Sequence, residues 1–110
     1  MLFFVYKREN SFMKSTEEYI TLLKSQKEYL TQKYQIRNLG LFGSVARNEQ
    51  TKDSDVDIYF ECSSMSLFTM CRLKYELEKI LGCTVDLLRK RKQLEGTSLE
   101  KSIKKDLIYV

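Results

Sequence analysis

The sequence predicts an α+β fold, organised as an α/β-like sandwich in which helices pack against a short β-sheet. Segments with helical spacing of apolar residues alternate with short apolar segments of strand type, in the order helix, strand, strand, helix, strand, helix. The chain has 110 residues, which is enough for one compact domain and too few for two. Its hydrophobic fraction of 43% and charged fraction of 31% are those of a globular protein and not of a disordered one.

Residues 1–12 are expected to be an extension that precedes a domain spanning residues 13–110. The extension begins apolar and strand-like, but its apolar part is too short for the core of a signal peptide, and no basic segment precedes it. No part of the chain approaches the roughly 18 consecutive apolar residues of a membrane-spanning helix. We therefore expect a soluble, cytoplasmic protein without a membrane partner.

The first helix is expected at residues 16–34 and the first strand at residues 36–42. Apolar residues recur at helical spacing through the helix, and Ser15 followed by Glu18 is the pattern of a capping box at its start. The strand is apolar and ends at Gly43. A polar, turn-like segment then precedes the next strand.

The second strand, second helix and third strand are expected at residues 56–60, 67–81 and 84–88. The second strand alternates apolar and polar residues, and the helix carries apolar residues at helical spacing until Gly82, a typical helix end. The chain closes with a short helix, residues 97–105, and an apolar tail.

A basic run from Arg89 to Lys92 links the third strand to the last helix. We interpret it as a solvated linker; the alternatives are a contact to an acidic partner surface or to nucleic acid. Basic and aromatic residues are not interleaved in the manner of RNA-binding proteins, so direct nucleic-acid binding is not expected. The net charge of +4 is compatible with polyanionic ligands, but solubility explains it equally well.

The absence of histidine excludes several kinds of chemistry. Without it there is no Ser–His or Cys–His nucleophilic pair, no imidazole base and no histidine-ligated zinc. The three cysteines form neither a CxxC pair nor an even disulfide set, so we expect reduced thiols. Chemistry must therefore depend on carboxylates, hydroxyls, lysine, arginine or a hard metal ion.

Three aspartates are candidates for metal binding and catalysis. Asp55 and Asp57 lie two residues apart on a predicted strand, so both side chains leave the same face. Adjacent carboxylates repel each other unless a cation lies between them, and Mg²⁺ suits such all-oxygen ligation. Asp86 lies in an apolar strand, where an aspartate is costly to bury without a partner. If that strand neighbours the other two acids, Asp86 could ligate a second metal or accept the proton of an attacking hydroxyl.

Each of these acids also has a simpler interpretation. Asp55 and Asp57 could be solvated acids at an exposed strand edge, and Asp86 could be a structural acid paired with a lysine or an arginine.

Gly43 and Ser44 are candidates for phosphate binding, because they lie where the first strand gives way to a short helical turn. Glycine lets the backbone approach a phosphate closely, and the serine hydroxyl and free N–H groups can donate to it. Arg47 could add a charge-assisted hydrogen bond to the same anion. Alternatively, Arg47 bridges to Glu49 or Asp55 and holds the loop.

Taken together, these motifs resemble those of the minimal nucleotidyltransferase (MNT) family of the DNA polymerase β-like superfamily, and within it the MNT antitoxins that pair with HEPN-domain toxins. The resemblance runs from about Met13 to the C-terminus and depends on Gly43-Ser44, Ala46-Arg47, Ser54-Asp55-Val56-Asp57 and Val85-Asp86-Leu87-Leu88. It implies a nucleotidyltransferase fold with a short mixed β-sheet flanked by helices. It further implies that Gly43 and Ser44 contact the nucleotide phosphates, that Asp55 and Asp57 are metal ligands, and that Asp86 is the third acid.

The activity that this resemblance implies is transfer of AMP from ATP to a hydroxyl, often of a tyrosine, on the partner toxin. Two Mg²⁺ ions would clamp the attacking and leaving oxygens of an in-line displacement. The chain departs from the family at Asn48, where glycine is usual; asparagine is next best suited to a left-handed backbone, so we expect the turn to be kept. The alternative function is a non-catalytic antitoxin that neutralises its partner by binding alone. Transfer to a small molecule is disfavoured, because such enzymes generally add a second domain.

Overall fold

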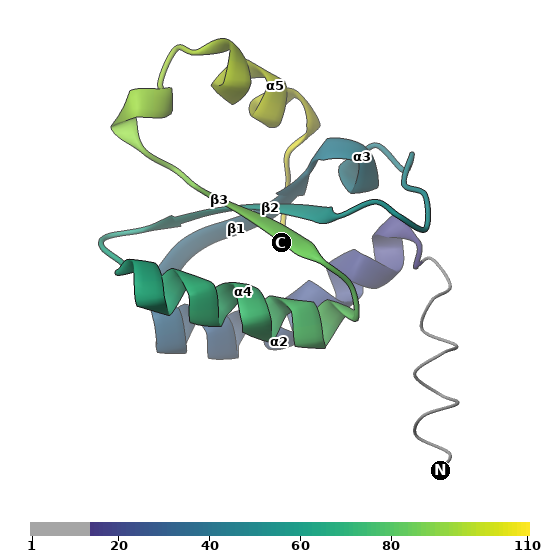
Figure 1. Ribbon diagram of the computed structural model, residues 1–110, viewed down its shortest axis with the longest axis horizontal. Coiled ribbons are helices and arrows are strands. Elements are labelled where there is room, and N and C mark those ends of the chain that lie inside the picture. The colour runs from purple at the N-terminus through teal and green to yellow at the C-terminus, as the bar shows by residue number, and fades with distance from the viewer. Residues whose placement is uncertain (1–13) are drawn as a thin grey trace.

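A computed structural model of the chain describes residues 14–110 (Figure 1). The predicted extension, residues 1–12, lies outside the described residues, so its assignment stays a prediction. Within the described part, no helix is both long enough and apolar enough to cross a membrane.

One mixed sheet forms the centre of the molecule. Its four strands lie in the order β3-β2-β1-β4, and their bounds are β1 Ile36–Phe42, β2 Val56–Cys62, β3 Val85–Arg89 and β4 Ile108–Tyr109. β1 pairs antiparallel with both β2 and β4, whereas β2 and β3 run parallel and are joined through a helix. The predicted α+β fold, with a short mixed sheet flanked by helices, is confirmed.

Helices cover both faces of the sheet (Figure 1). The two long helices, α2 (Thr16–Tyr34) and α4 (Leu67–Leu81), lie side by side on one face. The short helices α3 (Gly43–Ala46) and α5 (Ser98–Asp106) lie on the other. The 3₁₀ helix η1 (Lys92–Leu94) interrupts the linker between β3 and α5.

The local signals placed the long helices correctly. Ser15 and Glu18 form the predicted capping box: the Ser15 hydroxyl accepts from Glu18 N at 3.1 Å, and the Glu18 carboxylate accepts from Ser15 N at 2.7 Å. Both reciprocal bonds satisfy N–H groups that a helix start otherwise leaves free. α4 ends at Gly82, whose φ of 73° is left-handed, as a glycine helix end requires.

Three elements differ in their bounds from the sequence prediction. β2 continues to Cys62, β3 is shifted by one residue to Val85–Arg89, and α5 is shifted by one residue to Ser98–Asp106. The apolar tail contributes the edge strand β4, which the local pattern did not distinguish from a loop because only two of its residues pair with β1. The cysteines are free, as expected, with Cys62 buried and Cys71 exposed.

The hydrophobic core lies between the sheet and the two long helices. On β2 it takes Val56, Ile58 and Phe60, each fully buried. Because successive side chains of a strand leave opposite faces, this alternation directs Asp57 and Glu61 to the face that carries α3 and α5. The buried half of the strand thereby fixes where its acids point.

Candidate nucleotide and metal site

The fold brings the three predicted acids to one end of the sheet. Asp57 and Asp86 are register partners on the parallel strands β2 and β3, so their side chains leave the same face, and Asp55 directly precedes β2. Neighbouring strands lie about 4.8 Å apart. The condition set on the sequence, that the strand of Asp86 neighbours that of the other two acids, is therefore met.

Burial and mutual repulsion act on the central acid of this group. Asp57 is half-buried, and its pKa is raised from 3.8 to about 6, first by burial and then by the charges of Asp86 and Asp55; the charge of Arg47 acts in the opposite direction. A cation that binds beside a carboxylate with a raised pKa stabilises its charged form.

Asp86 itself is exposed, not buried. The burial cost expected for it does not arise, because β3 is an edge strand and its acid-bearing face is open at this point.

The acids form an open cluster and not a closed metal cage. Across residues 14–110, no group of three or more His, Cys, Asp or Glu side chains is arranged to hold a metal ion by itself. The donors available are carboxylate oxygens, which suit Mg²⁺, and this ion commonly takes one or two carboxylates and completes its shell with water and substrate phosphates. The residues therefore fit a magnesium ion whose remaining ligands come from a bound substrate.

Gly43 joins the predicted phosphate loop to this acid cluster. It starts α3 with a φ of +74°, and Phe42 just before it is the register partner of Asp57. A Cβ atom at Gly43 would overlap Asp57 Oδ2 and lie 3.0 Å from Asp57 Cγ. Glycine is therefore required twice, by the backbone conformation and by the carboxylate that packs against it. Ser44 follows, half-buried, in the first turn of α3.

The loop after α3 is tied to the start of α2. The Thr16 hydroxyl is buried and lies 2.6 Å from the Val45 carbonyl oxygen and 3.1 Å from Asn48 Oδ1. Gln50 adds a hydrogen bond of 3.0 Å from its side-chain amide to the Lys14 carbonyl. Asn48 has a φ of 60°, so the left-handed turn predicted for asparagine at this position is confirmed.

Arg47 is held by two carboxylates of the chain itself. Its Nε donates to Glu49 at 2.9 Å and its Nη1 to Asp106, at the end of α5, at 2.6 Å. The alternative of a bridge to Glu49 is thus realised, and Asp106 was not foreseen. The guanidinium still lies near enough to lower the pKa of Asp57. Its contact to a nucleotide stays a prediction.

The sequence analysis did not identify two charged residues near the site, Lys74 and Asp106. Lys74 on α4 bonds to Glu78 at 2.7 Å, and the charges of Asp86 and Asp55 contribute to raising its pKa. In the sequence it shows only the i,i+4 spacing of an ordinary surface ion pair. Asp106 has no local signal at all, because its partner Arg47 lies in a distant segment of the chain.

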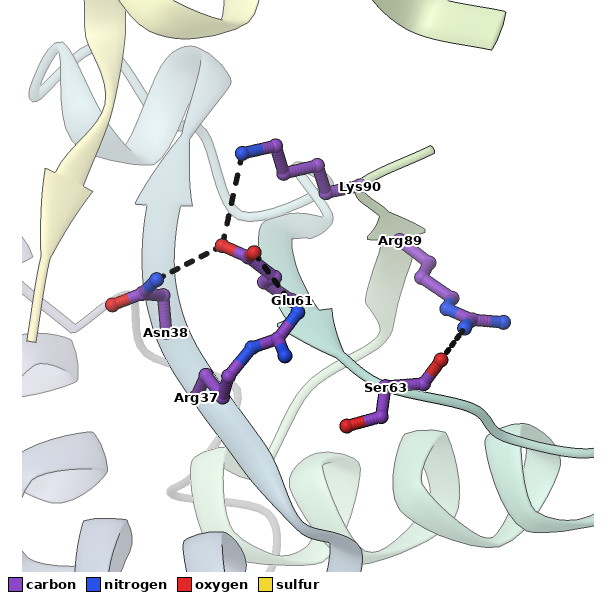
Figure 2. A network of polar contacts seen from close by, with 6 residues as sticks. All are labelled: Arg37, Asn38, Glu61, Ser63, Arg89 and Lys90. Carbon is purple, nitrogen blue, oxygen red and sulfur yellow. Dashed lines mark hydrogen bonds and ion pairs between the residues drawn. The ribbon is translucent and has the colours of Figure 1, made fainter. Parts of the chain in front are cut away.

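Two residues of the basic run, Arg89 and Lys90, form polar contacts within the molecule, as Figure 2 shows. Arg89 donates to the Ser63 carbonyl at 3.2 Å, and Lys90 Nζ lies 3.8 Å from Glu61 Oε1. These contacts agree with the interpretation of residues 89–92 as a linker, and they leave Arg91 and Lys92 exposed.

Glu61 collects donors from three residues at the end of the sheet away from the aspartates. Asn38 Nδ2 donates to it at 2.9 Å and Arg37 Nη2 at 3.1 Å, with Lys90 on a third side (Figure 2). The pKa of Glu61 is lowered, chiefly by the bond from Asn38 and then by the charges of Lys90 and Arg37.

Comparison with known proteins places the sequence among transferases. The profile of the family described as the nucleotidyltransferase domain matches residues 23–110. A relative from Methanocaldococcus jannaschii, which carries the provisional name protein adenylyltransferase MJ1379, is 43% identical over 101 residues, covering 89% of this chain and 100% of that protein. Protein adenylyltransferase MntA from Thermococcus cleftensis is 34% identical over 99 residues, covering 89% of this chain and 98% of that protein.

Two solved structures share the architecture. One, provisionally described as a minimal nucleotidyltransferase, superposes with a TM-score of 0.71 at 25% identity, covering 86% of this chain and 95% of that chain. The other belongs to a complex described as tri-AMPylated Shewanella oneidensis HEPN toxin with MNT antitoxin; it superposes with a TM-score of 0.51 at 18% identity, covering 94% of this chain and 70% of that chain. At this lower identity the likeness concerns the fold alone.

Proposed function

The chain belongs to the nucleotidyltransferase domain family, and we propose that it is a metal-dependent protein adenylyltransferase that modifies a cognate HEPN-domain toxin and thereby acts as its antitoxin. AMP would pass from ATP to a hydroxyl of the toxin, on a tyrosine side chain. Relatives that align over nearly their whole length bear adenylyltransferase names, and a structure of the same fold comes from a complex with an AMPylated HEPN toxin. The proposed reaction takes place in the cytoplasm, where ATP is available.

The single observation that carries the proposal is the contact between Gly43 and Asp57. It places a left-handed glycine, which has no side chain, against a carboxylate whose pKa is raised to about 6. The loop offers backbone and hydroxyl donors to phosphates, and the carboxylate offers oxygens to a hard cation. A nucleotide triphosphate with its cation requires both at one place.

The phosphate-binding residues and the three aspartates have different roles in the proposed reaction. Gly43 and Ser44 bind the phosphates, and Arg47 adds positive charge on the same side. Asp55 and Asp57 hold Mg²⁺, which when bound would neutralise the acids and stabilise charge that develops on the phosphates; Asp86 completes the set for a second ion.

The proposed chemical step is a displacement at the α-phosphorus of ATP, in which one P–O bond forms and another breaks. The acceptor oxygen forms a bond to the α-phosphorus, and the bond from that phosphorus to the oxygen bridging to the β-phosphate breaks. Pyrophosphate leaves with the electron pair. Asp86, exposed at the edge of the cluster, accepts the proton of the attacking hydroxyl.

Intact-protein mass spectrometry on the toxin tests this proposal. The proposed HEPN-domain partner is incubated with the wild-type chain, ATP and Mg²⁺, and its mass should rise by one or more AMP units. Asp86→Asn should still bind ATP and the toxin but leave the mass of the toxin unaltered. Full toxin inhibition at a fixed stoichiometry, without ATP and without any mass change, would instead establish the binding-only antitoxin.

A further inference from the structure

Lys74 on α4 is connected to the start of β3 through two contacts of Glu78. Its Nζ lies 2.7 Å from Glu78 Oε2, and the same oxygen accepts a hydrogen bond of 3.1 Å from Val85 N. β3 is an edge strand, and Val85 directly precedes Asp86. Glu78 thereby fixes the ammonium group of Lys74 beside the start of the strand that carries Asp86.

The start of β2 lies at the same place. Val56 N donates to the Thr84 carbonyl at 3.0 Å, and Asp55 directly precedes Val56. The charges of Asp86 and Asp55 both act on Lys74 and, after the bond to Glu78, contribute to raising its pKa. Because Glu78 Oε2 contacts both Lys74 Nζ and Val85 N, the ammonium group lies beside the start of β3, where Asp86 is the next residue, and it approaches from a different element than Arg47 does.

The two cations near the cluster differ in how many carboxylates of the chain already neutralise them: two pair with Arg47 and one with Lys74. The guanidinium of Arg47 is bonded to both Glu49 and Asp106. An ammonium group has three N–H donors, and the contact to Glu78 uses one of them, while 44% of the Lys74 side chain stays exposed. Lys74 therefore retains donors that an incoming anion can use.

We propose that Lys74 is a substrate-binding residue that donates to a phosphate oxygen of the bound nucleoside triphosphate, and that Glu78 is the residue that positions it. The inference depends on the proposed function, because it names a further contact of the same site. A triphosphate placed beside three carboxylates adds negative charge to negative charge, so a cation with free donors at the rim favours its binding. A purely structural role predicts something else, since an exposed i,i+4 ion pair contributes little to stability and nothing to nucleotide affinity.

The test compares Lys74→Met with Lys79→Met. Both changes remove one ammonium group from α4, but Lys79 lies over the ring of Tyr75, with Nζ 5.0 Å from the ring centroid, and forms no ion pair with the described acids. Calorimetric titration with a non-hydrolysable ATP analogue and Mg²⁺ measures affinity, and initial rates give KM and kcat. For Lys74→Met we expect affinity to fall at least tenfold and KM to rise in proportion, with a smaller change in kcat and an unchanged Tm. Lys79→Met should match the wild type.

Two further variants separate charge from packing. Lys74→Arg should recover most of the affinity, because it restores a cation at the same position. Glu78→Gln keeps an acceptor for Val85 N but removes the charge that orients Lys74, so KM should rise by a smaller factor than in Lys74→Met. Wild-type affinity in Lys74→Met overturns the inference and leaves the proposed function intact. A wild-type chain that does not bind the analogue overturns both.

Discussion

Asp57 and Glu61 lie on the same face of the same strand, and their surroundings are opposite. Glu61 is met by Asn38, Arg37 and Lys90, and its pKa is lowered (Figure 2). Among the described residues Asp57 forms no ion pair within 4 Å, and burial together with two neighbouring acids raises its pKa to about 6. Strand geometry is shared, so the difference comes entirely from the neighbours.

That difference separates a structural carboxylate from one suited to a ligand. Donors of the chain already satisfy Glu61, so an added cation would gain little by binding there. The charge of Asp57 is unfavourable in the free protein, and a cation beside it would stabilise that charge and offset the repulsion from Asp86 and Asp55. Within residues 14–110, no hydrogen bond or ion pair reaches the Asp57 carboxylate, whereas that of Glu61 has two hydrogen bonds and a further ion pair, and this contrast supports Asp57 as the proposed cation ligand.

The largest effect should come from neutralising each acid in turn. Asp57→Asn should reduce the rate of AMP transfer by roughly a thousandfold, about 4 kcal/mol, because it removes a metal ligand. Glu61→Gln should change the rate by less than about twofold, because its hydrogen-bonding partners hold it away from the site. Initial rates measured by mass spectrometry of the acceptor provide the comparison. Equal losses in the two variants would contradict it.

A smaller effect is expected for the glycine that touches Asp57. Gly43 and Gly96 have nearly the same backbone, with φ of +74° and +76°, but a Cβ at Gly96 meets nothing within 4 Å. Gly43→Ala and Gly96→Ala should therefore share a strain cost of about 1 kcal/mol.

Only Gly43→Ala should also displace the Asp57 carboxylate and weaken ATP binding, by tenfold or more in calorimetric titration. Thermal unfolding of both variants provides the control for strain. An unaltered affinity in Gly43→Ala would show that the loop does not contact the phosphates.

The smallest effect is a difference in how stability depends on pH. The pKa of Asp57 rises from 3.8 to about 6 on folding, so its contribution to the free energy of unfolding is present below about pH 4 and is lost as pH rises through 6. After allowance for solvent screening we expect a loss of about 1 kcal/mol. The lowered pKa of Glu61 acts with the opposite sign, because its contribution is lost as pH falls.

Urea unfolding between pH 4 and 7, without divalent cations, measures this dependence. Asp57→Asn should lack the loss toward neutral pH, whereas Glu61→Gln should keep that loss and lack the loss at the acid end. Mg²⁺ added at pH 7 should stabilise the wild type more than Asp57→Asn. The same slope in all three proteins would show that neither carboxylate is perturbed as described.

Local pattern was sufficient for the long elements and for the acids. α2 and α4 have the predicted bounds, because the capping box at Ser15, the glycine at the end of α4 and the spacing of apolar residues are properties of adjacent residues. The shared face of Asp55 and Asp57 follows likewise from strand alternation. Only the pairing of β2 with β3 was needed to add Asp86.

What the sequence did not predict depends on contacts between distant segments. The bond from Arg47 to Asp106 joins α3 to α5, and β4 becomes a strand only because Gly40 and Leu41 of β1 lie beside it. The position of Lys74 at the acids likewise depends on Glu78 reaching the edge of β3. No periodicity within one element reports such placements.

The hydrogen bonds from the Thr16 hydroxyl to Val45 and Asn48 affect local unfolding of the loop after α3. A buried hydroxyl shared by α2 and the loop means that the loop cannot separate without disturbing the first turn of that helix. Loop and helix start therefore form one cooperative unit of local unfolding, and the free energy of its opening includes the capping box at Ser15. Thr16, which lies outside the proposed site residues, thus helps to set how often this segment unfolds locally.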